Sequence, residues 1–153
     1  HPKTMNEQIH QRNIESIVIS FDIRLPEEEE MQKLTISEEQ KVYDIVRLRK
    51  IDGDEFSLEY TTMPVNLIPG LTIDVLKGSI YAYIVEKLGL SIGQANRIVR
   101  ADKSDIFDQK YLHLKEDEPV LELEQVAYLS CGKPFEYSYT RDHYLKRELT
   151  YVP

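Results

Sequence analysis

The feature that most constrains the fold of this chain is an internal repeat of a helix followed by a long hairpin. A helix end at Leu34–Ile36, a strand, a turn glycine at Gly53 and an aromatic returning strand recur in the same order from Leu112, with Gly132 as the second turn glycine. The offset is 78 residues at the helix end and 79 from the glycine onward. Two related halves of this kind predict an α+β fold, one antiparallel sheet flanked by helices.

The first hairpin carries two arginines on one strand face. The segment Lys41–Ile51 reads as a strand, so Arg47 and Arg49 project to the same side. In the second half, an offset of 79 gives Val126 and Tyr128 at these positions. The hairpin itself therefore does not require arginines, and we expect them to serve a function local to the first half.

The returning strand Glu55–Met63 brings a carboxylate to the arginines in only one register. If the turn around Gly53 has three residues, Glu59 lies opposite Arg47 and shares its face. A loop of two or four residues would place Glu59 on the other face. The alternative interpretation of the arginines is that they are solvated charges on the outside of a sheet.

A second candidate feature is the helix start that follows Gly78. Ser79 is a suitable N-cap and Gly89 a suitable stop, which predicts a helix between them with Tyr81 in its first turn. Free amides and the positive dipole end attract anions, and a preceding glycine lets a ligand approach the backbone. The alternative is an ordinary capped helix with Tyr81 in the core.

The other elements follow from the positions of β-branched runs, prolines and caps. On the last strand, Glu136 and Ser138 share one face, and alternation places Phe135 with Tyr137 on the other. The predicted strands are Ile14–Leu25, Gln94–Ala101, Pro119–Leu129 and Phe135–Asp142. The predicted helices are Met5–Gln11 with Thr4 as N-cap, a helix after Pro26, and a helix from Ser104 or Asp105 to Leu112.

Composition limits the class of protein. The 153 residues are 41% hydrophobic and suffice for one domain with a real core. A net charge of -8 argues against nucleic-acid binding by this segment, because phosphate neutralisation needs a basic surface. One cysteine and no apolar run of membrane-spanning length predict a soluble, cytoplasmic domain with no membrane association. The chain begins with histidine rather than methionine, so we expect a piece of a longer protein.

No catalytic or metal-binding constellation is visible in the sequence. The four histidines lie far apart, and Cys131 has no recognisable catalytic partner. The acidic run Glu27–Glu30 is expected to cap a helix rather than to bind a metal, because consecutive glutamates fan around a helix. We therefore expect no cofactor, no metal and no enzymatic activity.

Four motifs in order resemble the UTRA domain, the effector-binding domain of GntR-type bacterial transcription regulators of the HutC subfamily. The resemblance covers essentially the whole chain. The motifs are IVRLRKIDGDEFSLE at Ile45–Glu59, IPGL at Ile68–Leu71, GSIYAYI at Gly78–Ile84 and GKPFEYSYT at Gly132–Thr140.

The resemblance implies a chorismate lyase-like fold over residues 1–153 that binds a small molecule. A winged helix-turn-helix domain would precede it and is absent from this chain, so operator DNA would be contacted only through that domain, and a homodimer is expected. In members that sense phosphosugars, the resemblance places the phosphate at the residues matching Arg47, Arg49, Ser79, Tyr81 and Thr4. It places the sugar at those matching Glu59 and Glu136. Family members often have serine at the position of Thr4.

The sequence thus favours a non-catalytic sensor of a phosphorylated sugar that allosterically controls DNA binding. Three alternatives remain open. One is a chorismate lyase-like enzyme, and another is a sensor of a non-phosphorylated carboxylate. The third is a structural dimerisation module in which Arg47 and Arg49 are surface charges.

Overall fold

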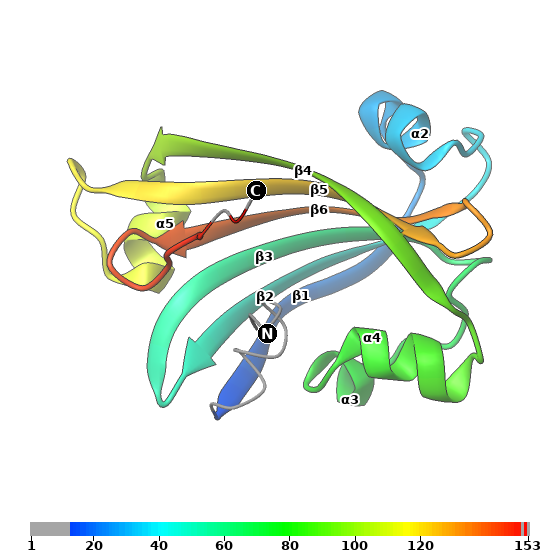
Figure 1. Ribbon diagram of the computed structural model, residues 1–153, viewed down its shortest axis with the longest axis horizontal. Coiled ribbons are helices and arrows are strands. Elements are labelled where there is room, and N and C mark those ends of the chain that lie inside the picture. The colour runs from blue at the N-terminus through cyan, green and yellow to red at the C-terminus, as the bar shows by residue number, and fades with distance from the viewer. Residues whose placement is uncertain (1–12, 151, 153) are drawn as a thin grey trace.

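The computed structural model describes residues 13–150 and 152. Its centre is a six-stranded antiparallel sheet in the order β1-β2-β3-β6-β5-β4 (Figure 1). The two hairpins therefore lie side by side in the middle, and β1 and β4 form the edges. The strands are β1 (Ile14–Arg24), β2 (Val42–Ile51), β3 (Asp54–Pro64), β4 (Ile92–Lys103), β5 (Pro119–Leu129) and β6 (Pro134–His143).

Helical segments cover both faces of the sheet. The segments are α2 (Glu28–Leu34), α3 (Ile73–Leu76), α4 (Ile80–Ala82), the π-helical η1 (Tyr83–Lys87) and α5 (Ile106–Leu112). Leu34 of α2 and Leu112 of α5 pack on one face, which we call the α2–α5 face. Ile80 and Ile84 pack on the other, the α4 face, against Ile45 of β2. Figure 1 shows α2 and α4 on opposite sides of the sheet. No helix in the described part of the chain could span a membrane.

The two longer helices begin and end alike, which confirms the repeat. In α2 the Glu30 carboxylate accepts from the Glu27 amide at 2.8 Å, and in α5 Asp108 accepts from the Asp105 amide at 2.9 Å. Both helices end in a left-handed residue, at positions 35 and 113. All these pairs are separated by 78 residues. The helices predicted after Pro26 and at Asp105 are confirmed.

The first hairpin has the predicted strand pairing, but its turn is shorter than the predicted one. Arg47 pairs with Glu59. The turn, however, has only two residues, Asp52 and Gly53, with φ values of 50° and 86° that suit a type I′ turn. The expectation that a two-residue turn would put Glu59 on the other face is wrong, because a β-bulge at Phe56 adds the missing residue.

The second hairpin has the same irregularity, and it moves an aromatic side chain to the other face. The register shifts between the pairs made by Ala127 and Tyr128, so Phe135 is the extra residue of β6. The Phe135 ring packs in the cluster of the α4 face, 5.7 Å from the Tyr81 ring. Simple alternation predicted Phe135 on the same face as Tyr137, and this was wrong because the bulge breaks the two-residue period.

The two bulges also correct which residues correspond to the arginines. Aligning bulge with bulge gives an offset of 78 along the first strand of each hairpin. Arg47 therefore corresponds to Gln125 and Arg49 to Ala127, both directed to the α4 face. The offset of 79 had predicted Val126 and the tyrosine two residues later, but Val126 packs on the α2–α5 face. The conclusion that the hairpin does not require arginines stands.

Strands β3 and β6 join the halves with a symmetric register. Tyr60 pairs with Tyr139, its own counterpart at an offset of 79. Glu59 pairs with Thr140 on one side of Tyr60, and Thr61 pairs with Ser138 on the other side. At the offset of 79, Glu59 corresponds to Ser138 and Thr61 to Thr140, so the two pairs are equivalent with the strands exchanged. A pseudo-two-fold axis therefore passes through the Tyr60–Tyr139 pair.

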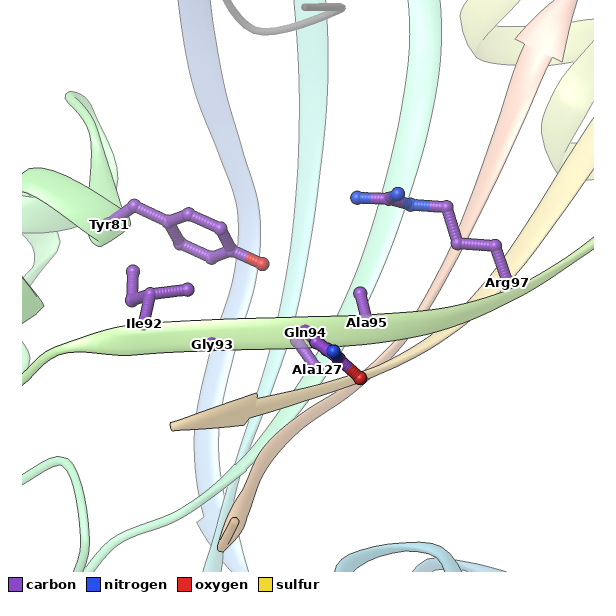
Figure 2. A pocket seen from close by; sticks show the side chains of 7 residues that line it. All are labelled: Tyr81, Ile92, Gly93, Gln94, Ala95, Arg97 and Ala127. Carbon is purple, nitrogen blue, oxygen red and sulfur yellow. The ribbon is translucent and has the colours of Figure 1, made fainter. Parts of the chain in front are cut away.

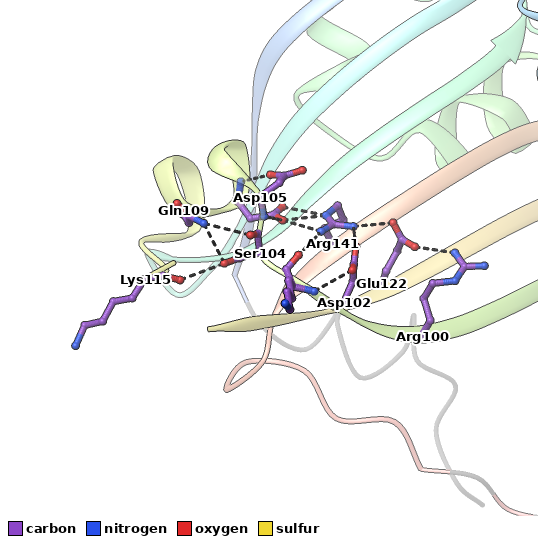
Figure 3. A network of polar contacts seen from close by, with 10 residues as sticks. Arg100, Asp102, Ser104, Asp105, Gln109, Lys115, Glu122 and Arg141 are labelled. Atoms are coloured by element: carbon purple, nitrogen blue, oxygen red, sulfur yellow. Dashed lines mark hydrogen bonds and ion pairs between the residues drawn. The ribbon is translucent and has the colours of Figure 1, made fainter. Parts of the chain in front are cut away.

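Each half ties its helix to the sheet through an arginine, but the arginine comes from a different strand. In the first half, Arg24 of β1 contacts Glu30 of α2 at 2.7 Å. In the second half, Arg141 of β6 contacts Asp108 of α5 at 2.9 Å. Figure 3 shows Arg141 joined to Asp102 and Glu122. Asp102, which occupies the position of Arg24, is also bound by Arg141, at 3.0 Å. The halves thus conserve the ion-pair network while exchanging the strand that supplies its cation.

Candidate functional site

The candidate site lies on the α4 face, where the side chains of both hairpins point toward the α3–α4 segment. A cavity of about 590 Å³ opens between Tyr81 and strand β4. Its lining residues are Tyr81, Ile92, Gly93, Gln94, Ala95, Arg97 and Ala127 (Figure 2). A cavity of this size falls in the range typical of small-molecule sites.

Arg47 fastens the α3–α4 segment to the sheet. Its guanidinium donates to Glu59 from Nε at 3.1 Å and from Nη2 at 2.6 Å. Its Nη1 donates to the carbonyl oxygens of Leu76 and Gly78 at 3.0 and 3.1 Å. The side chain is only 5% exposed. Arg47 therefore positions the segment before Ser79 beside β2, and protein acceptors already use most of its donors.

Arg49 lies on the same face and donates fewer hydrogen bonds to the protein than Arg47 does. Its Nη1 donates to Glu59 at 3.1 Å, and its side chain is 25% exposed. Its Nε is buried and has no hydrogen-bond partner among the described residues, and the same is true of Thr140 Oγ1 on β6. Burial lowers the pKa of Arg49. Buried donors without partners are costly, so the described residues leave Arg49 with an unsatisfied hydrogen-bonding group.

In the described part of the chain, Glu59 is the carboxylate that hydrogen-bonds to both Arg47 and Arg49. It also accepts from the Thr61 hydroxyl at 3.2 Å. Burial acts to raise its pKa, but the charges of Arg47 and Arg49 outweigh burial and lower it, so Glu59 is ionised. Two guanidinium groups share one carboxylate, and the cluster therefore has a net charge of +1.

Ser79 starts the helical segment as predicted. Its Oγ accepts from the Ala82 amide at 3.1 Å, and the residue is exposed. After one turn the segment continues as the π-helical η1, and Gly89 follows it with a φ of 66°. Ser79 is brought near Arg47 through the carbonyl of Gly78.

Tyr81 and Glu136 form a second polar group on this face. The Tyr81 hydroxyl donates to Glu136 Oε2 at 2.9 Å. Gln125 Nε2 donates to the same oxygen at 2.6 Å and to the Tyr81 hydroxyl at 3.2 Å. The structure thus brings Tyr81 to the carboxylate of Glu136 and not to the arginines.

Glu136 is a buried carboxylate without a cationic partner in the described part of the chain. Burial, and secondly the charge of Glu59, raise its pKa above the ordinary value. Above about pH 4.3, the unfolded value, the folded state therefore binds more protons through this group than the unfolded state does. Its contribution to the free energy of unfolding falls as pH rises through the raised pKa.

Replacing Glu136 with glutamine should remove this fall. We expect the stability of the wild type relative to Glu136→Gln to decrease from about pH 4 upward, as Glu136 ionises inside the protein. The urea midpoints of both proteins, measured across this range, test it. Lost hydrogen bonds would displace the two curves by a constant amount, so parallel curves would contradict the prediction.

Two residues of this site were not found by sequence reasoning, Gln125 and Arg97. Arg97 of β4 donates from Nε to Gln125 Oε1 at 2.7 Å. Figure 2 shows the Arg97 and Tyr81 side chains pointing toward each other over β4. The repeat, aligned at 78, would have identified Gln125 as the counterpart of Arg47. Arg97 follows no motif, and only the pairing of β4 with β5 places it here.

One predicted site residue, Thr4, lies outside the described residues. Within residues 13–150 and 152, no group of three or more potential metal ligands is present. In the acidic run, Glu30 caps α2 and binds Arg24.

The similarity of this chain to known proteins agrees with the fold. Residues 10–144 match the UTRA domain. The chain belongs to the UTRA domain family. It is 45% identical over 141 residues to the HTH-type transcriptional regulator GmuR of Bacillus subtilis, covering 92% of this chain and 60% of that protein. This UTRA domain thus spans less than two thirds of that relative's length.

Solved structures support the same assignment. The crystal structure of the possible transcriptional regulator YydK from Bacillus subtilis matches with a TM-score of 0.89 and 28% identity, covering 93% of this chain and 64% of that one. The effector binding domain of the Bacillus subtilis trehalose repressor TreR matches with a TM-score of 0.79 and 25% identity, covering 91% and 96%. The α+β fold predicted from the sequence is confirmed.

Proposed function

We propose that this UTRA domain is the effector-sensing part of a bacterial transcription regulator and that its effector is a phosphorylated sugar. The proposal is carried by Arg49, whose buried Nε lacks a partner among the described residues beside a cluster with a net positive charge. Similarity to regulators that carry a helix-turn-helix name supports the regulatory role.

The phosphate would bind at Arg49 and at Ser79, which follows the Gly78 carbonyl that Arg47 holds. A phosphate monoester carries nearly two negative charges and three acceptor oxygens, which suit a guanidinium fork and a hydroxyl donor. Arg47 and Glu59 hold the two sides of this position together through the bonds described above. The anion would satisfy the free donors of Arg49 and balance the excess positive charge.

The sugar would lie toward Glu136 and Tyr81, along the same face. Only Oε2 of Glu136 receives the Tyr81 and Gln125 donors, so Oε1 is left to accept from a ligand hydroxyl. Carboxylates accept such bonds strongly, and the buried position adds to their strength. This arrangement gives an acceptor at the sugar end and donors at the phosphate end.

Binding would reach DNA through the segment that Arg47 holds. A phosphate that competes with Glu59 for the arginines changes the contacts of the α3–α4 segment, which shifts the balance between two arrangements of the regulator. A winged helix-turn-helix domain placed N-terminal to this domain would contact the operator, and the full-length protein would act as a homodimer. The domain itself would catalyse no reaction.

Ligand-induced thermal stabilisation tests the phosphate site. At about 100 times its dissociation constant, a ligand adds about 2.7 kcal/mol, which raises the melting temperature of a domain of this size by roughly 5–10 °C. We expect a hexose phosphate, amino-sugar phosphate or disaccharide phosphate to give such a shift. In Arg49→Gln most of the shift should be lost, because the free donors are removed.

A matched control is Lys50→Gln. Lys50 is the next residue on β2, faces the other side of the sheet and makes only a 3.7 Å ion pair with Glu55. This variant loses the same charge and should keep the shift. Stabilisation by urocanate, a fatty acid or an unphosphorylated sugar alone would overturn the phosphate site.

A further inference from the structure

Arg97 is a cationic side chain at the far end of the cavity. It lies on the edge strand β4, is exposed and lines the cavity beside Tyr81 (Figure 2). Only its Nε is engaged, by the neutral Gln125. Within residues 13–150 and 152, no carboxylate lies at ion-pair distance from Arg97, so both Nη groups and their charge are available.

Arg100, another arginine of β4, does have carboxylate partners, so the lack of an ion pair at Arg97 is not a general property of this strand. Arg100 projects to the other face and forms ion pairs with Glu122 at 2.7 Å and Glu124 at 3.5 Å. These two glutamates of the neighbouring strand β5 balance the charge of Arg100. Arg97 has Gln125 at the equivalent cross-strand position, and its charge is left for something in the cavity.

Arg97 and Arg49 are held on different sides of strand β6, because Arg49 donates to Glu59 of β3 and Arg97 donates to Gln125 of β5. In the strand order, β2 and β4 are separated by four steps. At about 4.8 Å a step, this is roughly 19 Å along the sheet. Two separate ligand groups would therefore suit the two cationic ends of the α4 face, with Glu136 on the strand β6 between them.

We propose that Arg97 recognises a second anionic group of the effector, so that the site takes a sugar derivative with a phosphate at one end and a carboxylate or second phosphate at the other. This inference rests on the proposed phosphate site. Gln125 supports Arg97 by accepting from Nε, which directs the two Nη groups into the cavity. A guanidinium fork is suited to either anion, because both present two oxygens in one plane.

The test uses two open-chain probes that differ at a single carbon, 6-phosphogluconate and sorbitol 6-phosphate. The first has a carboxylate at the end remote from the phosphate, and the second has a hydroxyl there. A charged hydrogen bond is worth about 1.5–3 kcal/mol, so calorimetry should show roughly 10- to 100-fold tighter binding of 6-phosphogluconate. In Arg97→Gln this preference should vanish while sorbitol 6-phosphate binds as before.

Further variants separate this inference from the proposed function. Arg97→Lys should keep part of the preference, and Arg100→Gln, on the other face of the same strand, should keep all of it. Arg49→Gln should weaken both probes equally. Equal wild-type affinity for the two probes, or an equal loss of both in Arg97→Gln, would overturn the role of Arg97 and leave the phosphate site intact. Binding of neither probe would overturn both proposals.

Discussion

Replacing Glu59 with glutamine is expected to destabilise the domain by about 3–5 kcal/mol. Among the described residues, Glu59 is the carboxylate that forms ion pairs with both arginines on this face, and Arg47 is 5% exposed. Without the carboxylate charge of Glu59, two neighbouring guanidinium groups remain poorly solvated and uncompensated. Removing one partner of a buried ion pair is strongly destabilising for this reason. Urea denaturation at neutral pH measures the loss.

The control for this substitution is Glu55→Gln on the same strand. Glu55 makes a longer contact of 3.7 Å with Lys50 and is expected to contribute less than about 1 kcal/mol.

Because the folded pKa of Glu59 is depressed, its stabilisation is present above the unfolded value of about 4.3 and is lost as pH falls through the folded pKa. A Glu59→Gln protein as stable as the wild type at pH 7 would contradict the cluster described here.

Replacing Arg141 with methionine is expected to cost a similar amount, about 3–5 kcal/mol. Arg141 holds three carboxylates together, Asp108 at 2.9 Å, Glu122 at 2.8 Å and Asp102 at 3.0 Å. The side chain of Asp108 is 0% exposed, so its charge would be left buried without a cation. Chemical denaturation again provides the measurement.

Two further variants show whether the loss comes from unpaired charge. Arg100→Met removes an arginine that is 40% exposed and should destabilise the domain much less than Arg141→Met does. The double variant Arg141→Met, Asp108→Leu removes cation and buried anion together, and it should be less destabilised than the sum of the single variants. Strict additivity would show that the pair is not energetically coupled.

Most of the fold could be predicted from the sequence because its signals are local. The caps at Asp105 and Ser79 and the alternation of apolar residues mark helices and strands with little help from tertiary contacts. The bulges at Phe56 and Phe135 could not be predicted in this way. A bulge changes the face of every residue beyond it, and nothing in its own composition distinguishes it from a regular strand residue.

The candidate site was predictable only where its residues follow one strand or one helix start. Arg47 and Arg49 share a strand, and the structure places Glu59 against both. The group of Tyr81, Gln125 and Arg97 depends on three elements that meet only in the folded sheet, so no sequence spacing connects them. The sequence therefore indicated the two arginines, Tyr81 and Glu136, and missed Gln125 and Arg97.

The symmetric register of β3 and β6 makes this domain equivalent to a homodimer whose two subunits are joined in one chain. In a true homodimer with an isologous interface, every substitution appears twice and the walls of a central site must be alike. Joining the subunits removes this restriction. Arg47 and Arg49 in one half then oppose Gln125 and Ala127 in the other. An asymmetric ligand of the proposed site would meet two unlike walls, which would favour a single binding orientation.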